Sequence, residues 1–547
     1  VPMTQSQMKN TTTSCARIQV LALAAALLSI GCSGHGTPPP VDGGVDGGAD
    51  SGAERTVTID RDAQGTPIIY ADTLADAAYG VGYAQGRDRL EAVLRQLLSA
   101  TGRLSEFLGV GPRAGSTAYV QADRRTHLLR IPQTSETLYG TLDAGLREYL
   151  ESYAAGLGRA LEEARAGGTA PAWAADYAPT GTDVFAVTRM GPIVSQVSVA
   201  LADAQRAPTV ACPELYTDAS ASNAWAATAP LAPAGHTVLL SDPHLPWDLD
   251  PLDGSLDGYL LYEVHLVVGE RRYGGVGFLG APLFGPGYSD LLAWGGTHSG
   301  IDTADAYRLT RVAPGGLDYY LGPAVRTLQE RTVSFLVRDG SGHRTETFTA
   351  LYSAIGPVVE QGGELFTAVL TMLDQPGEAA VGWAVLTAAS FDDTVARLDE
   401  FIGQTDEKNY VLAGREGGVL YVLAGRAPKR REGVDYCHLL DAADAMTLPF
   451  FDAGGAVEVV PAGDHPVVAD PPTGYVVCNN SQPQSVTDFA SFGVDPNVEL
   501  DWHPGLYPRT SDPNGGGPRQ RKAREALDGA TAGSFASASS TWCKRLV

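Results

Sequence analysis

The stretch Ser222–Trp247, SNAWAATAPLAPAGHTVLLSDPHLPW, lies in the middle of the 547-residue chain, at a change in the character of the sequence. Before it, long segments carry apolar residues at helical spacing. After it come short β-rich runs with frequent glycines, such as YLLYEVHLVV, RTVSFLVRD and GVLYVLAG. Helices followed by strands predict a large layered α+β body. The stretch itself raises the question of why a serine and a histidine, Ser222 and His244, stand there.

The segment before this stretch predicts two short strands and then several helices. RTVTIDRDAQGTPIIYA gives the strands, with Gly65-Thr66-Pro67 as turn residues. A helix follows whose apolar face consists of Leu90, Val93, Leu94, Leu97 and Leu98. DAGLREYLESYAAGLGRALEEARAG is amphipathic, and GTDVFAVTRMGPIVSQVSVALADAQ opens with a cap-like Thr182-Asp183. Residues 207–221 show neither period and are a candidate spacer.

Composition and charge limit the classes of function. The net charge is −24 with a pI of about 4.7, and such an acidic surface repels phosphate backbones. We therefore expect no nucleic-acid partner. Apolar residues make up 44% of the chain and charged residues 19%, as in ordinary globular proteins.

The N-terminal residues 1–32 have the pattern of a secretory signal: basic Lys9 and Arg17, an apolar run, then Gly31-Cys32. A membrane-spanning helix needs about 20 apolar residues, more than this run offers. LSIGC resembles a bacterial lipobox, which implies acylation of Cys32 and a periplasmic or outer-membrane lipoprotein of a Gram-negative-type bacterium; simple cleavage and release is the alternative. Residues 33–53, rich in Pro, Gly and Asp, predict a flexible linker.

Four cysteines lie beyond the signal: Cys212, Cys437, Cys478 and Cys543. Their spacings match no zinc pattern. An exported protein meets an oxidising compartment, so a disulfide is possible, and the sequence leaves the pairing open.

Several motifs in fixed order resemble one known family. IDRDAQGTPIIYA, YGVGYAQGRDRL, SNAW followed by SDPHLPW, GAPLFGPGYSDLLAWGGT, NYVLAGREGGVLYVLAGRAPKR and GYVVCNN cover residues 54–525. Together they resemble the penicillin acylase family of N-terminal-nucleophile hydrolases, nearest its acyl-homoserine-lactone, cephalosporin and cyclic-lipopeptide branch. The resemblance implies an αββα four-layer sandwich with a helical α segment (residues 54–206), a spacer (207–221) and a β segment (222–547).

The resemblance gives Ser222 a chemical reason for its position. A serine hydroxyl is a poor nucleophile and needs a base. Autocatalytic cleavage between Ala221 and Ser222 would free an α-amine with a pKa of about 7.7–8.0, which can take the hydroxyl proton. One residue then supplies both nucleophile and base. The resemblance implies that the α and β segments stay associated as a heterodimer derived from one chain.

The resemblance also implies residues that orient the reacting groups of Ser222. His244 is expected to orient the hydroxyl and amine of Ser222. Arg519 is expected to orient the amine end, with Arg521 as the rival. No cofactor is needed for this chemistry.

Two donors are expected to stabilise the tetrahedral oxyanion of acyl transfer. The first is the backbone N–H of His298, after the AWGGT motif; its side chain is unusual at a position that we associate with Ala or Val. The second is the side chain of Asn479, with Asn480 as a register alternative.

The substrate is expected to be a small-molecule N-acyl amide. Leu245 and Pro286 align with positions that hold Phe in phenylacetyl acylases, which favours an aliphatic acyl chain. The leaving group stays open between a homoserine lactone, a lipopeptide amine and a β-lactam nucleus.

Some family members bind a structural calcium ion near the oxyanion turn. Asp302 and Asp305 match two of its ligand positions, and Asp203 is the candidate for the third. Solvated surface acids are the alternative interpretation of these residues.

The end of the chain, LDGATAGSFASASSTWCKRLV, shows no apolar period. Family β segments usually run a few hundred residues further, so we expect the β segment to be truncated, with its C-terminal part missing. The alternative function is therefore a truncated, non-catalytic acylase-like lipoprotein that acts as a binding or relic protein.

Overall fold

The computed structural model of the chain describes residues 45–46, 56–209, 222–228, 231–232, 236–244, 261–405, 407–493 and 518–528. All of them belong to the unit Gly43–Val547. The expected signal with Cys32, and the part of the expected spacer that contains Ala221, lie outside the described residues. Val45 and Asp46, within the expected linker, pair with Val57 and Thr56.

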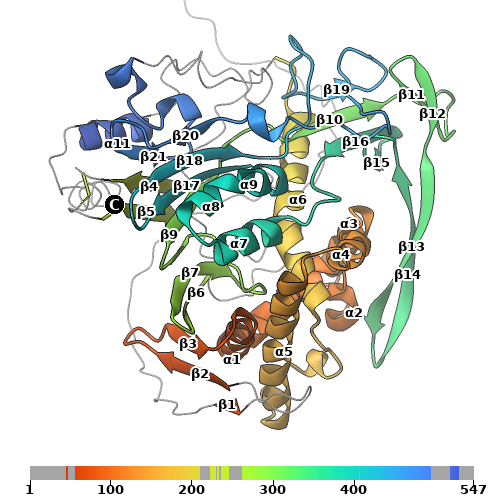
Figure 1. The fold of residues 1–547 in the computed structure, drawn as a ribbon. Coiled ribbons are helices and arrows are strands. Elements are labelled where there is room, and N and C mark those ends of the chain that lie inside the picture. The colour runs from red at the N-terminus through yellow and green to blue at the C-terminus, as the bar shows by residue number, and fades with distance from the viewer. Residues whose placement is uncertain are drawn as a thin grey trace, which may run out of the picture. The chain divides into compact units, whose positions relative to one another are not determined.

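The first part of the described chain is largely helical, as the sequence predicts (Figure 1). It contains α1 (Leu74–Ala100), α2 (Leu104–Leu108), α3 (Ala118–Leu128), α4 (Ile131–Tyr139), α5 (Ala144–Ala166) and α6 (Gly181–Gln205). The predicted apolar face of α1 is confirmed, because Val93, Leu94, Leu97 and Leu98 are fully buried and Leu90 is partly buried.

The predicted start of α6 is wrong by two residues. The cap is Thr180, whose hydroxyl accepts a hydrogen bond from Asp183 N, while the Asp183 carboxylate accepts one from Thr180 N. This reciprocal pair is a capping box, and it places Thr182 inside the helix.

The described residues form four sheets, and the largest of them includes strands on both sides of the first helices. The largest has the order β1 (Val45–Asp46), β2 (Thr56–Arg61), β3 (Pro67–Ala71), β6 (Leu261–Val268), β7 (Arg271–Phe278), β8 (Gly287–Ser289), β9 (Leu292–Thr297), β17 (Lys408–Gly414), β18 (Val419–Ala424) and β20 (Val467–Ala469). The predicted strand pair β2–β3 is confirmed. Strand β3 pairs in parallel with β6, so residues on both sides of Ser222 build this sheet.

The other sheets are smaller. One has the order β21 (Tyr475–Cys478), β4 (Ser222–Ala227) and β5 (Val238–Pro243). A second has the order β13 (Gln329–Asp339), β14 (Gly342–Tyr352), β15 (Pro357–Gln361), β16 (Glu364–Leu370), β10 (Ala304–Leu309) and β19 (Leu440–Asp441). The pair β11 (Asp318–Leu321) and β12 (Ala324–Thr327) stands alone. Later helices are α7 (Glu378–Thr387), α8 (Phe391–Ala396), α9 (Leu398–Gln404) and α11 (Pro518–Asp528).

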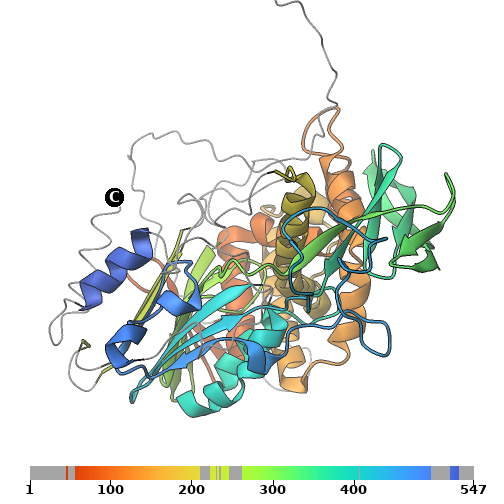
Figure 2. The ribbon, with the colours of Figure 1, turned by 90° about the horizontal axis from the view of Figure 1, so that it is seen from above.

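Alternate residues of the central strands pack in different apolar clusters. In β18, Leu420 and Val422 belong to the apolar cluster that includes Phe401 and Ile402 of α9, while Val419 and Tyr421 face β4 and β21. In β4, the alternation repeats. Ala224 and Ala226 face β17 and β18, and Trp225 and Ala227 pack with Ala523 and Leu527 of α11. The period of two in a strand therefore places β4 between the large sheet and α11, which Figure 2 shows in blue.

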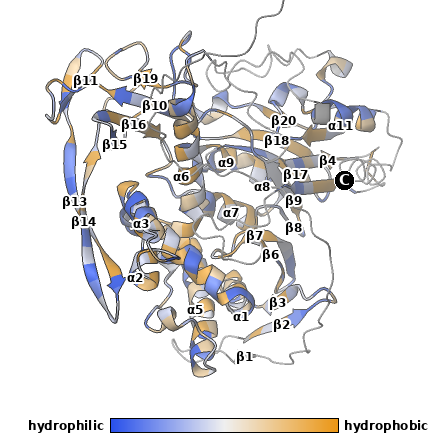
Figure 3. Cartoon of the chain, turned by 180° about the vertical axis from the view of Figure 1, so that it is seen from behind, coloured by the Kyte–Doolittle hydropathy of each residue, from blue (hydrophilic) through white to orange (hydrophobic). Residues whose placement is uncertain are grey.

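Helix α6 is long and strongly apolar (Figure 3). By length and composition it could cross a membrane. Its buried residues, including Phe185 and Ile193, instead pack in two apolar clusters with other elements of the described chain. Such burial is what a core helix of a globular domain requires.

Helices α1 and α5 cross at glycines that allow backbone contact. A Cβ atom on Gly156 would lie 1.9 Å from the carbonyl oxygen of Tyr79, and one on Gly82 would lie 2.1 Å from that of Tyr153. The obstacles are backbone atoms of a neighbouring helix, so neither glycine tolerates a side chain without moving the helices apart.

We predict that Gly156→Ala lowers the free energy of unfolding by about 3 kcal/mol, the upper range for overpacking a core. Gly158→Ala is the matched control two residues along α5, where the nearest atom to a new Cβ is Pro179 Cγ at 3.8 Å. That change should stabilise the helix by about 0.5–1 kcal/mol. Urea unfolding of both variants measures the difference, and equal stabilities would contradict the close crossing.

Candidate active site

Ser222 is the first residue of β4 and is 6% exposed. It lies in register opposite Pro243 of β5. By the alternation of β4, its side chain belongs to the face of Ala224 and Ala226, which looks toward β17 and β18. Its backbone N–H donates to Asn480 Oδ1 at 2.6 Å. A strongly buried serine thus begins a strand with its nitrogen held by a side-chain amide.

Asn480 joins Ser222 to the turn that carries His298. Its backbone has a φ of 60°, a left-handed conformation that Asn tolerates better than most residues. Its Nδ2 donates to the His298 carbonyl oxygen at 3.0 Å, and its Oδ1 accepts from Ser222. Both ends of this amide therefore hold other groups in place.

The turn after β9 is fixed at the His298 carbonyl. This oxygen also accepts hydrogen bonds from Asn409 Nδ2 at 3.1 Å and from the neighbouring Thr297 hydroxyl at 3.1 Å. Asn409 Oδ1 in turn accepts from Tyr421 OH at 2.6 Å. These bonds fix the peptide plane of the His298 carbonyl and Ser299 N–H, which follows directly after the N–H of His298 in the turn.

Glu407 holds the same turn through the next residues. One carboxylate oxygen accepts from Gly300 N at 2.8 Å, and the other lies 3.1 Å from His298 Nδ1. Glu407 is 7% exposed, whereas the His298 side chain is 40% exposed. The imidazole is thus oriented by a buried carboxylate and partly open to solvent.

Asn479 is oriented by its neighbours on β4 and α11. Its Oδ1 accepts from Trp225 Nε1 at 2.8 Å, and its backbone N–H donates to Gln520 Oε1 at 3.1 Å. An indole N–H is only a donor, so the oxygen of the Asn479 amide must face Trp225 and the Nδ2 donor must point elsewhere. Gln520 also donates to the carbonyls of Val477 and Ser485, which ties α11 to this strand end.

His244 follows β5 directly and therefore lies beside the start of β4. Its Nε2 is 3.0 Å from Asp242 Oδ2 and 3.1 Å from Asn223 Nδ2. Among the described contacts, the His244 ring has no hydrogen bond to Ser222. His244 thus follows Pro243, the strand partner of Ser222. Its ring, however, is paired with Asp242 and Asn223.

The remaining predicted residues are placed only in part. Arg519 belongs to α11, but its side chain lies outside the described part of the chain; its rival Arg521 is exposed. Leu245 lies outside the described residues. The Pro286 carbonyl accepts from Val276 N of β7, and none of the described contacts joins Pro286 to Ser222.

Asp203, Asp302 and Asp305 lie near one another in the interior, although their carboxylate oxygens are not all within 4.8 Å of one another. Asp203 lies in the last turn of α6, and its charge interacts with those of Asp302 and Asp305. Arg430, with a 1% exposed side chain, lies 2.9 Å from Asp302 Oδ1 and 2.7 Å from Asp305 Oδ1. Arg206 Nη2 lies 3.6 Å from Asp203 Oδ1. These acids are buried, and the interpretation of them as solvated surface acids is wrong.

The buried environment of this acid cluster disfavours three ionised carboxylates without a bound cation. Burial, followed by the charges of Asp302 and Asp305, raises the pKa of Asp203 to about 8. Burial raises the pKa of Asp302 to about 7, against the opposing effect of Arg430. Asp302 Oδ1 is paired with Arg430, whereas Asp203 Oδ2 and Asp305 Oδ2 are buried and make no hydrogen bond within the described structure. Such oxygens suit a hard cation like Ca²⁺.

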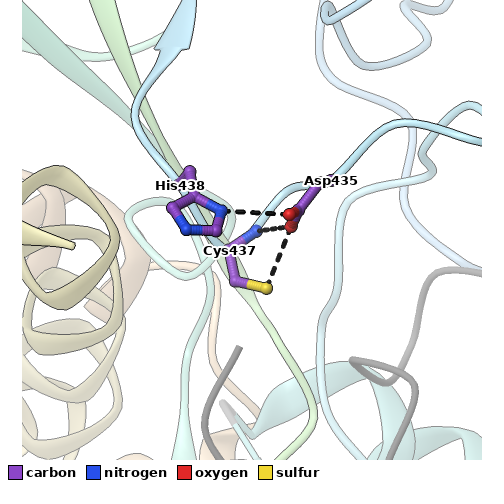
Figure 4. Close-up of side chains that lie close together, drawn as sticks. All are labelled: Asp435, Cys437 and His438. Carbon is purple, nitrogen blue, oxygen red and sulfur yellow. Dashed lines mark hydrogen bonds and ion pairs between the residues drawn. The ribbon is translucent and has the colours of Figure 1, made fainter. Parts of the chain in front are cut away.

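A second cluster contains residue types that bind metals, but it has too few available ligands for a zinc site. Asp435, Cys437 and His438 bring their ligand atoms within 4.8 Å of one another (Figure 4). His438 Nδ1 lies 3.0 Å from Asp435 Oδ2, and Cys437 N donates to Asp435 Oδ1. Cys437 is disulfide-bonded, so it offers no thiolate. Two ligands remain, which is too few for a protein zinc site.

Sequence reasoning missed the residues that hold the site together. Glu407, Asn409 and Gln520 act through bonds to backbone groups of the turn and of the Asn479 strand end. Asn409 carried a signal, a polar residue in the otherwise apolar run NYVLAG. Glu407 and Gln520 stand in polar surroundings in the sequence and carried none.

The chain is similar to the acyl-homoserine lactone acylase PvdQ of Pseudomonas putida, with 27% identity over 64% of this chain and 46% of the relative. It is 25% identical to aculeacin-A acylase of Actinoplanes utahensis over 55% of this chain and 41% of the relative. The chain thus spans about half the length of the curated relatives it matches.

Among solved structures, a thermostable penicillin G acylase from Alcaligenes faecalis matches 58% of this chain and 51% of its own, with 17% identity and a TM-score of 0.41. The profile of the penicillin amidase family matches residues 56–542, nearly all of the described chain. The order of the motifs, the strand that begins at Ser222 and this profile agree, and the chain belongs to the penicillin amidase family.

Proposed function

We propose that the chain is an amidohydrolase that cleaves the linear amide of N-acyl substrates with Ser222 as an N-terminal nucleophile. One observation carries the proposal: hydrogen bonds through Asn480 join the nitrogen of Ser222 to the carbonyl of His298. The residue that supplies the candidate nucleophile and base is therefore tied to the turn whose His298 N–H is a candidate oxyanion donor. The relatives named as acylases support the same class of reaction.

In the proposed reaction, the Ser222 hydroxyl attacks the amide carbonyl of the substrate. The α-amine freed by cleavage takes the hydroxyl proton and passes it to the leaving amine. Asn480 Oδ1 accepts a hydrogen from this amine, which leaves the nitrogen lone pair for the hydroxyl. The N–H of His298 and Asn479 Nδ2 stabilise the oxyanion. Water then hydrolyses the acyl ester on Ser222. Arg519 is proposed to orient the amine end, and His244, paired with Asp242, to support the site from β5.

We also propose the αββα four-layer arrangement for this chain. The apolar clusters support it, because α1, α5 and α6 pack on one face of the large sheet and the sheet of β4 packs on the other. Helix α11 packs on the far face of β4. The large sheet and the sheet of β4 are thus each covered on both faces, as stable layered domains require.

The proposed substrate is a small N-acyl amide with an aliphatic acyl chain. Leu245 and Pro286, which stand where phenylacetyl acylases have Phe, support this choice, as does a relative named for acyl-homoserine lactones. The amine component stays open between a homoserine lactone, a lipopeptide amine and a β-lactam nucleus. Release of a free amine, read with an amine-reactive dye, tests the reaction class. Ring-opened lactone that keeps its acyl group would contradict it.

We further propose that the protein is exported and anchored through acylated Cys32, on the basis of the signal pattern in residues 1–32. Metabolic labelling with a fatty acid, lost in Cys32→Ser, tests the anchor. Labelling of the Cys32→Ser variant as well would contradict it.

We propose a structural Ca²⁺ at the cluster of Asp203, Asp302 and Asp305. The buried carboxylate oxygens without hydrogen-bond partners support it, and carboxylates are the ligands that Ca²⁺ prefers. The ion would have to draw the carboxylates together, because only Asp435, Cys437 and His438 bring three ligand atoms within 4.8 Å among the described residues. It would join α6 to the segment after β9.

Ser222→Ala should leave one full-length chain without amidase activity, because cleavage and turnover share the nucleophile. The unchanged sequence should give two chains, the second beginning Ser-Asn-Ala-Trp by N-terminal sequencing. Ser222→Cys should still be cleaved, since a thiolate is a competent nucleophile. An unchanged sequence that stays one folded chain would favour the non-catalytic alternative. Cleavage of Ser222→Ala at the same bond would assign the cut to another protease.

Asn479→Ala should lower kcat by about 10²–10³ and leave KM nearly unchanged, as loss of an oxyanion donor does. Precursor cleavage should slow in parallel. Asn480→Ala is the neighbouring comparison, since this residue holds the Ser222 nitrogen. A large kcat loss in Asn480→Ala with none in Asn479→Ala would assign the oxyanion donor to Asn480 instead of Asn479.

Calcium at millimolar concentration should raise the Tm by a few degrees over the same protein in chelator, because a ligand that binds only the folded state stabilises it. Magnesium is the matched control and should have little effect, since it dehydrates reluctantly. The calcium shift should be lost in Asp203→Asn. Equal Tm values in calcium, magnesium and chelator would show that Arg430 alone neutralises the cluster.

A further inference from the structure

Cys437 is disulfide-bonded and lies just before β19, beside the end of α6. Arg206, the residue after α6, donates from Nε to the Cys437 carbonyl oxygen at 2.8 Å. The Cys437 Sγ lies 3.1 Å from Asp435 Oδ1 (Figure 4). The end of the predicted α segment and the Cys437 loop are therefore in direct contact.

The choice of disulfide partner for Cys437 can be narrowed among the other cysteines of the sequence. Cys478 is free and buried, so it is not the partner. Four other cysteines remain: Cys15, Cys32, Cys212 and Cys543. All but Cys543 precede Ser222. Cys15 falls within the expected signal, and Cys32 is the expected acylation site.

Chain length favours Cys212. It stands six residues after Arg206, and six residues span at most about 20 Å. The Arg206 side chain already reaches the Cys437 backbone. A disulfide needs the two Cα atoms within about 4.4–6.8 Å, which so short a connection allows.

We propose that a disulfide between Cys212 and Cys437 keeps the two chains covalently joined after cleavage before Ser222. The inference rests on the proposed function for the cleavage step but not for the disulfide itself. Two thiols lose two protons and two electrons to an oxidised, disulfide-carrying thiol oxidoreductase, which becomes a dithiol. The new C-terminus of the α segment would then stay attached beside Asp203 and the acid cluster.

Electrophoresis with and without reductant tests the link on the full chain, after free thiols are blocked with N-ethylmaleimide. The cleaved protein should migrate as one full-length species without reductant and as two chains with it. Cys437→Ser and Cys212→Ser should each give two chains under both conditions, with cleavage before Ser222 unchanged. Cys543→Ser is the matched control and should behave as the unchanged sequence does.

The outcomes separate the two proposals. Two chains without reductant in the unchanged sequence would overturn the link while confirming the cleavage. One chain under both conditions would overturn the cleavage. Mass spectrometry of a non-reduced digest then decides the link directly: a peptide pair with Cys212 and Cys437 supports it, and a pair with Cys437 and Cys543 overturns it. This readout depends on neither cleavage nor the stability of a variant.

Discussion

The burial of strand β4 on both faces is the constraint on which the rest of the site depends. All six of its residues are buried, with Ala224 and Ala226 facing the large sheet and Trp225 facing α11. A strand in such a position cannot shift by one residue, because a one-residue slip would exchange its two faces. Ser222 at its first position is therefore held in register against Pro243 of β5.

Polar groups at the ends of these strands are satisfied by one another, and this makes the site rigid. The His298 carbonyl accepts from Asn409 and Asn480, and Glu407 accepts from Gly300 N. Leaving a buried polar group unpaired costs about 1–3 kcal/mol, so these bonds favour one arrangement of the turn. A turn held in this way can present its N–H groups to a developing charge without reorganisation.

In the acid cluster, by contrast, the buried polar groups are not all paired. Asp302 and Asp305 share the buried guanidinium of Arg430, Asp203 lies beside Arg206, and burial raises the pKa values of all three acids. Buried charges are normally paired or bound to a metal. The cluster joins the end of α6 to the segment after β9, close to the contact of Arg206 with Cys437. Electrostatic and covalent links between the two predicted segments thus gather at the end of α6.

The sequence by itself determined the helices before Ser222, the strand pair β2–β3, the apolar face of α1 and the family, because periodicity and motif order are local properties of the chain. The sequence identified Ser222, Asn479 and the three acids as candidate site residues. It did not identify the residues that hold them in place. The tertiary structure decided that Asn480, rather than His244, bonds the Ser222 nitrogen, and that Glu407, Asn409 and Gln520 support the site. Such contacts join residues between 41 and 258 positions apart, and only the packing of the sheets and of α11 brings them together.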